Sequence, residues 1–112
     1  MNDRAKHEST RRLAHRLLDY ENIATTPTTG DGTPDLDTPA AWISTSAQTL
    51  ARVGHSLAQA QQKAREASDD RPVVLVNRYE RKGTSADALA VLSVHDLARL
   101  LTAHADAQEV AT

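Results

Sequence analysis

Apolar residues recur every three or four positions in three stretches of the chain, which is the spacing of one face of an α-helix. In the second half of the middle stretch the apolar positions are all alanine, with Gln59 and Lys63 among the polar remainder. Because alanine is small, this helix is expected to lie close to its neighbours. Three helices are therefore predicted, over residues 4–20, 49–68 and 93–104.

Runs of β-branched residues predict strands between these helices. Residues 73–76 form a continuous apolar run, which is typical of a strand covered on both faces. The alternation around Trp42 is weaker, and this tryptophan is expected in the core or at an interface. Turn residues divide the threonine-rich segment 25–39 into two short strands. The remaining predicted strands cover residues 40–46 and 88–92.

The order of these elements predicts one α/β domain, α-β-β-β-α-β-β-α, with a mixed central sheet flanked by helices. The domain spans residues 1–112. Its terminal segments, 1–8 and 105–112, are expected to fray because they carry little apolar pattern.

Local signals suggest where the second and third helices begin. Thr45 with Gln48, and Ser93 with Asp96, have the spacing of capping boxes. Gly54 costs about 1 kcal/mol of helix propensity relative to alanine, so it is expected at a close contact.

Composition limits the classes of function. Thirteen basic and fifteen acidic residues give a net charge of -2, so binding to nucleic acid would need a local basic patch. The absence of cysteine excludes disulfides, zinc-thiolate sites and thiol catalysis. Only 39% of the residues are hydrophobic, so a thin core and further burial in a homodimer are expected. Without a membrane-spanning run or a signal-peptide pattern, the expected location is cytoplasmic.

Six basic residues on two segments form a candidate patch for a phosphate backbone. The alternative is a solvated helix face and a charged hairpin. The five histidines show no ligand spacing, and the chain has neither a nucleophile-elbow serine nor a phosphate loop. The candidate DNA-binding residues are Arg11, Arg12, Arg16, Arg78, Arg81 and Lys82.

The order of elements and five short segments together resemble the PDDEXK nuclease superfamily, which has the restriction endonuclease-like fold. The likeness is closest to the small Holliday junction resolvase-like proteins of phages and GC-rich bacteria, and it covers most of residues 10–103. The resemblance thus implies a phage or mobile-element origin. The segments are Pro34-Asp35, Ile43–Ser46, Leu57–Ala60, Arg71–Val76 and Asp87–Leu92.

In that family, an aspartate at a strand start and a Glu-x-Lys pair on the next strand hold Mg²⁺ and orient the attacking water. Asp35 matches the aspartate, but Ser44 and Ser46 stand at the glutamate and lysine positions. Serine offers neither the carboxylate that a hard cation prefers nor the charge of lysine. Alternate strand residues share a face, so these positions are expected in one cleft. The resemblance also places Thr10 where relatives carry a helix glutamate, with Glu8 only a neighbour.

These replacements favour a catalytically inactive nuclease-fold protein that acts as a protein- or DNA-binding or assembly module, with no catalytic residue and no cofactor. A homodimer or another protein partner is expected, and no membrane. The alternative is a small Mg²⁺-dependent endonuclease or resolvase-like enzyme whose metal site is rebuilt from Asp31, Asp35 and Asp37. Acids beside glycine and proline are also ordinary turn residues, which is the simpler interpretation of all three.

Overall fold

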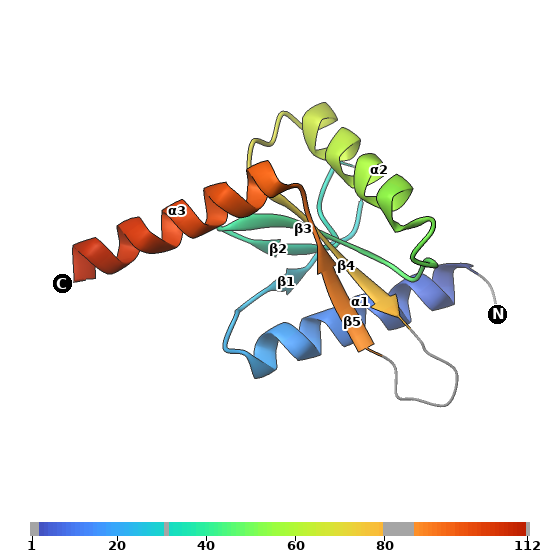
Figure 1. The fold of residues 1–112 in the computed structure, drawn as a ribbon. Helices are drawn as coiled ribbons and strands as arrows, with labels where there is room; N and C mark the ends of the chain where they lie inside the picture. The colour runs from blue at the N-terminus through green and yellow to red at the C-terminus, as the bar shows by residue number, and fades with distance from the viewer. Residues whose placement is uncertain (1–2, 31, 80–86, 112) are drawn as a thin grey trace.

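Five strands form one mixed sheet between two helices, and a third helix follows the last strand (Figure 1). The computed structural model describes residues 3–30, 32–79 and 87–111 of the chain. Within these residues the elements follow the order α-β-β-β-α-β-β-α, as the sequence predicts. They are α1 (Asp3–Tyr20), β1 (Thr26–Pro27), β2 (Leu36–Thr38), β3 (Ala41–Ser46), α2 (Val53–Glu66), β4 (Val73–Tyr79), β5 (Asp87–Val91) and α3 (Val94–Ala111).

The strands lie in the sheet in their order along the chain, β1-β2-β3-β4-β5. Neighbouring strands are antiparallel except β3 and β4, which run parallel. A parallel pair needs a long crossover connection, and α2 forms the helical part of it. The register pairs Ser44 with Leu75 and Ser46 with Asn77. The C-terminal ends of β3 and β4 therefore lie side by side.

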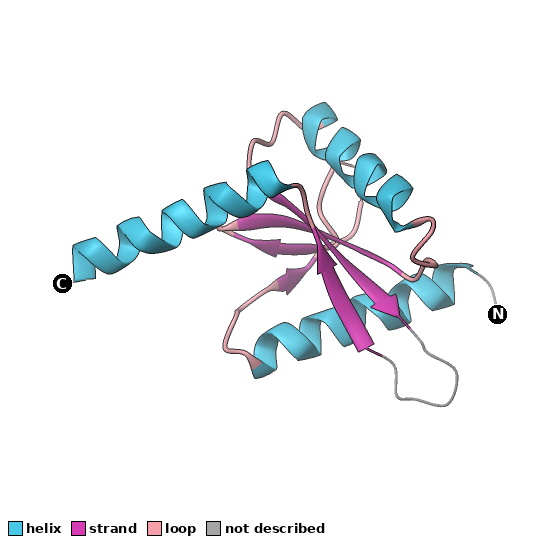
Figure 2. Cartoon of the chain, viewed as in Figure 1, coloured by secondary structure: helices cyan, strands magenta, loops and turns pink. Residues whose placement is uncertain are grey.

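Alternation along β3 divides the core into two layers, one under α1 and one under α2 (Figure 2). Ile43 belongs to the α1 layer, whereas Trp42 belongs to the α2 layer and is only 1% exposed, which confirms its expected place in the core. Two of the alanines predicted to face inward on α2 are buried against it. The clusters are Ala14, Leu36, Ala41 and Ile43 on the α1 face, and Trp42, Ala60, Ala64 and Val73 on the α2 face.

Helix α2 begins at Val53, later than the predicted residue 49. The expected capping box is wrong, because the N-cap residue is Arg52 and makes no side-chain cap hydrogen bond. Gln48 instead binds through its backbone N–H and C=O to the side chain of Asn77. This contact holds the segment before the helix on the neighbouring strand. A tertiary hydrogen bond thus overrides a local helix signal.

The close contact expected at Gly54 is also absent. A Cβ atom added at this position would meet no atom within 4 Å. The glycine is exposed in the first turn of α2, where backbone N–H groups have no partner within the helix. The position of Gly54 at the helix end, and not close packing, explains why the helix tolerates a glycine there.

Helix α3 projects away from the sheet (Figure 1). Its predicted start is confirmed, because the backbone N–H of Asp96 donates to Ser93 Oγ at 3.0 Å. The carboxylate of Asp96 also accepts the backbone N–H of Val73, which ties this end of the helix to β4. Residues 105–111, which were expected to fray, are helical, and α1 is helical from Asp3. Among the described residues, no helix has both the length and the apolar character needed to cross a membrane.

Candidate functional site

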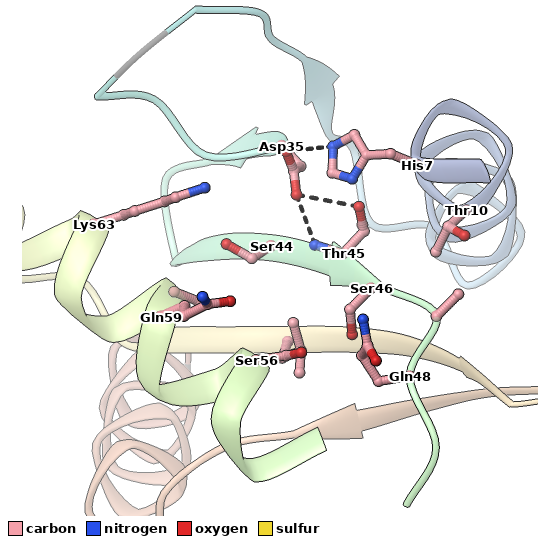
Figure 3. A pocket seen from close by; sticks show the side chains of 13 residues that line it. His7, Thr10, Asp35, Ser44, Thr45, Ser46, Gln48, Ser56, Gln59 and Lys63 are labelled. Atoms are coloured by element: carbon pink, nitrogen blue, oxygen red, sulfur yellow. Dashed lines mark hydrogen bonds and ion pairs between the residues drawn. The ribbon is translucent and has the colours of Figure 1, made fainter. Parts of the chain in front are cut away.

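A cavity of about 390 Å³ opens where the end of β3 meets α2 and the start of α1 (Figure 3). It gathers the three positions that the resemblance singles out, Asp35, Ser44 and Ser46. Thr10 lines it as well, whereas Glu8 does not. The expectation of a shared cleft is therefore confirmed. Most of the other lining residues are polar. They are His7, Thr45, Ala47, Gln48, Ser56, Gln59, Ala60, Lys63 and Leu75.

The carboxylate of Asp35 joins three segments of the chain. One oxygen, Oδ2, accepts the backbone N–H of Thr45 at 2.7 Å and its hydroxyl at 3.1 Å. The other oxygen, Oδ1, lies 3.1 Å from Nε2 of His7 on α1 (Figure 3). Both carboxylate oxygens therefore have partners within the protein. Asp35 fixes β3 and α1 relative to the segment before β2, a role that turn chemistry did not predict.

The two serines on β3 occupy the expected positions but are bonded to neighbouring side chains. Ser44 Oγ accepts the indole N–H of Trp42 at 3.2 Å. Ser46 Oγ donates to Asn77 Oδ1 at 2.6 Å. Neither hydroxyl carries charge, so this strand supplies no ionic group to the cavity.

Asn77 supports the cavity from β4 and is not among the residues predicted from the sequence. Its side chain is fully buried, and Oδ1 accepts both the Ser46 hydroxyl and the backbone N–H of Gln48. Its Nδ2 donates to the backbone carbonyl of Gln48. The available signal was an amide directly after an apolar strand run, where a buried polar group must find partners.

Lys63 is the second residue that was missed. It was assigned to the polar remainder of α2, but it lines the cavity together with Gln59 and Ser56 (Figure 3). These three residues are spaced by three and four positions, so they share one helix face. Hence the cavity does contain a cation, supplied by a helix and not by β3.

The acids proposed for a rebuilt metal site do not all reach the cavity. Asp37 does not line it and instead forms an ion pair with Arg71 at 2.8 Å. Arg71 also holds both carboxylate oxygens of Asp69. The hydrogen bond from Arg71 lowers the pKa of Asp69 below its ordinary value, and Asp69 and then Asp37 raise the pKa of Arg71. Asp31 lies outside the described residues.

A second hollow, of about 350 Å³, lies between α1 and β4. Three of the candidate DNA-binding residues line it, Arg12 and Arg16 from α1 and Arg78 from β4. Arg78 donates to Ser9 Oγ at 3.2 Å, which draws the strand residue against the helix. Arg12 lies 4.0 Å from Glu8, one helical turn earlier.

The other candidate basic residues do not share this hollow. Arg11 points to a different neighbour and donates to the backbone carbonyl of Thr28 at 3.0 Å. Arg81 and Lys82 lie outside the described residues. The structure therefore brings together three of the six arginine and lysine candidates.

Chemically, the larger cavity offers hydroxyls, amides, one ammonium group and one carboxylate that is already bonded. Within the described part of the chain, no three His, Cys, Asp or Glu side chains gather as a metal site would require. The smaller hollow offers guanidinium groups, which match phosphate oxygens. Neither a protein-family model, nor a curated protein, nor a solved structure matches this chain.

Proposed function

We propose that this chain is a non-catalytic nucleic-acid-binding domain on a nuclease-like fold, which contacts the phosphate backbone through Arg12, Arg16 and Arg78. The observation that carries the proposal is the convergence of these residues. They come from α1 and β4, which are far apart in the sequence, yet they line one hollow.

Electrostatics supports this location for the contact. The net charge of the chain is -2, so attraction of a polyanion must be local. Guanidinium groups bind phosphate oxygens through two parallel N–H donors, and such contacts position a protein on the backbone without reading sequence. Binding of this kind releases counterions and weakens steeply as salt rises.

The larger cavity supports the non-catalytic part of the proposal. Metal-dependent hydrolysis needs anionic oxygens that are available to a hard cation. Here the carboxylate of Asp35 is bonded to Thr45 and His7, while Ser44 and Ser46 are neutral. Ser44 is bonded to Trp42 within β3, and Ser46 joins the end of β3 to Asn77 of β4.

Salt-dependent binding tests the arginine contact. Fluorescence anisotropy would follow a duplex and a four-way DNA junction between about 50 and 200 mM salt. The double variant Arg12→Gln with Arg16→Gln should bind about tenfold more weakly, with a log–log salt slope shallower by about 2. Both changes replace a guanidinium with a neutral, polar amide, so the comparison with a control that carries the same two changes elsewhere reports the local charge.

The matched control is Arg52→Gln with Arg65→Gln, which removes the same charge from exposed positions at the start and end of α2. This control should bind like the wild type. An equal loss in both double variants would indicate attraction by overall charge alone. No binding to either DNA at the lowest salt would overturn the proposal.

A second candidate, a Mg²⁺-dependent endonuclease, is favoured by one observation: Lys63 enters the cavity that also contains Asp35. Incubation of supercoiled plasmid and four-way junction with Mg²⁺ or Mn²⁺ separates the two candidates. We expect no cleavage. Metal-dependent cleavage that disappears in both Asp35→Ala and Lys63→Ala would show that the protein is a nuclease and would contradict the non-catalytic proposal.

A further inference from the structure

Helix α3 carries an apolar stripe on the side that faces away from the sheet. Val94 is 82% exposed, Leu97 42% and Leu101 59%. Ala98 and Ala105 continue the same stripe at helical spacing. The opposite side of the first turns contacts the body of the protein, where the Asp96 carboxylate is buried against Val73.

Such a helix is poorly stabilised by its own chain. Residues 101–109 are all exposed, and α3 extends beyond the sheet over most of its length (Figure 1). An unsupported helical segment shorter than about 12 residues, like the exposed part of α3, is marginal in water, because most helical stability in proteins comes from packing of an apolar face. Exposed leucines in a row mark a contact surface.

We propose that a second copy of this chain packs its α3 antiparallel against the stripe, forming a homodimer. Charge complementarity selects this occupant and this orientation. His95 and Arg99 lie in the first half of α3, and Asp106 and Glu109 lie in the second half, on the same flank of the stripe.

Antiparallel pairing centred near residue 102 places Arg99 beside the partner's Asp106, twice in each dimer. Parallel pairing would turn this flank to opposite sides of the helix pair, so Arg99 would have no acidic partner across it. Arg99 already donates to Asp96 and to the carbonyl of Asp70. Its guanidinium group has five N–H donors, so it can donate a further hydrogen bond to the carboxylate of the partner's Asp106.

Side-chain size and the position of the rest of the molecule favour the same arrangement. The leucines of the stripe lie in the first half of the helix and Ala105 continues it in the second half, so antiparallel pairing packs leucine against alanine. It also places the two sheets at opposite ends of the helix pair. An 18-residue helix is about 27 Å long, so the contact belongs to the small interfaces, below about 1,200 Å². We therefore expect a weak dimer that dissociates on dilution.

Analytical ultracentrifugation of the full chain over a concentration series tests the surface. Leu101→Lys should shift the dimer toward monomer by about tenfold or more in dissociation constant, because each dimer loses the contact twice. Leu50→Lys is the matched control, since Leu50 is 54% exposed and lies outside α3. Circular dichroism would verify that both variants fold.

Disulfide cross-linking tests the orientation of the two helices. Because the chain has no native cysteine, only the introduced cysteines can form the cross-link. A mixture of Ala98→Cys and Ala105→Cys should give a cross-linked heterodimer, whereas each variant alone should give little product. Efficient cross-linking of each variant with itself would indicate parallel helices and overturn the proposal. So would a monomer at every concentration, or a dimer that Leu101→Lys leaves intact.

Discussion

Asn77 determines how the chain leaves strand β3. Its one buried amide satisfies the hydroxyl of Ser46 and both backbone groups of Gln48. An amide has separate donor and acceptor atoms and can do this, whereas an ionised carboxylate has no donor. The side chain thus fixes one wall of the larger cavity.

Replacing Asn77 tests that role. Asn77→Ala should lower the free energy of unfolding by about 2 to 3 kcal/mol, because buried partners lose their hydrogen bonds. Urea denaturation measures the change. Gln59→Ala, at an exposed residue of the same cavity, should stay within about 0.5 kcal/mol of wild type. Equal losses in the two variants would contradict the assigned role.

At the scale of single residues, part of the site could be predicted from the sequence. Ser44 and Ser46 share one face because strand alternation has a fixed period, and Asp35 and Thr10 reach the same cavity from other segments. Lys63 was missed because amphipathic patterns separate apolar from polar positions but do not show where a polar side chain meets another element. Asn77, Lys63 and the partners of Asp35 all depend on contacts between distant segments.

Among the secondary-structure elements, the loop between α2 and β4 is held by a charged clasp, formed by Arg71 with Asp69 and Asp37. It joins the start of β4 to β2, the strand on the other side of β3. Arg71 also donates to the carbonyl of Thr38 at 2.7 Å. The clasp therefore closes the end of the sheet opposite the larger cavity.

The clasp predicts a dependence of stability on pH. Because the pKa of Asp69 is lowered in the folded protein, its contribution is complete above the ordinary value of about 4 and is lost as pH falls through the lower, folded value. Asp69→Asn should reduce stability by about 1 kcal/mol at neutral pH. Urea denaturation as a function of pH should show the difference shrinking in acid. The neighbouring Asp70→Asn is the control, and an equal, pH-dependent loss there would argue against the clasp.

The order of elements followed from periodicity, since helix and strand patterns differ and the turn residues between them are distinct. Boundaries followed less well. The start of α2 moved from residue 49 to Val53 because a buried amide on β4 binds Gln48. Helix α3 continues to Ala111, beyond the predicted end at residue 104, and its residues 101–109 are exposed.

For the whole molecule, the two proposals together predict bivalent binding. A dimer through α3 carries two arginine hollows at the ends of a helix pair. DNA long enough to reach both should bind about tenfold or more tightly than DNA that reaches one, because the second contact is intramolecular. Anisotropy with duplexes of about 15 and about 45 base pairs measures this gain. Leu101→Lys should abolish the gain while leaving binding to the short duplex unchanged, and a gain that survives in this variant would show that dimerisation is not its cause.

Strand β4 sends consecutive side chains to the two sides of the sheet. Asn77 bonds Ser46 and Gln48, which line the larger cavity on one face, and Arg78 lines the arginine hollow on the other. A deletion of one residue before Asn77 would therefore place Arg78 where the amide lies, and an insertion there would place Asn77 where the arginine lies. In the evolution of this chain, each site can change by substitution without the other, but a length change in this strand would damage both at once.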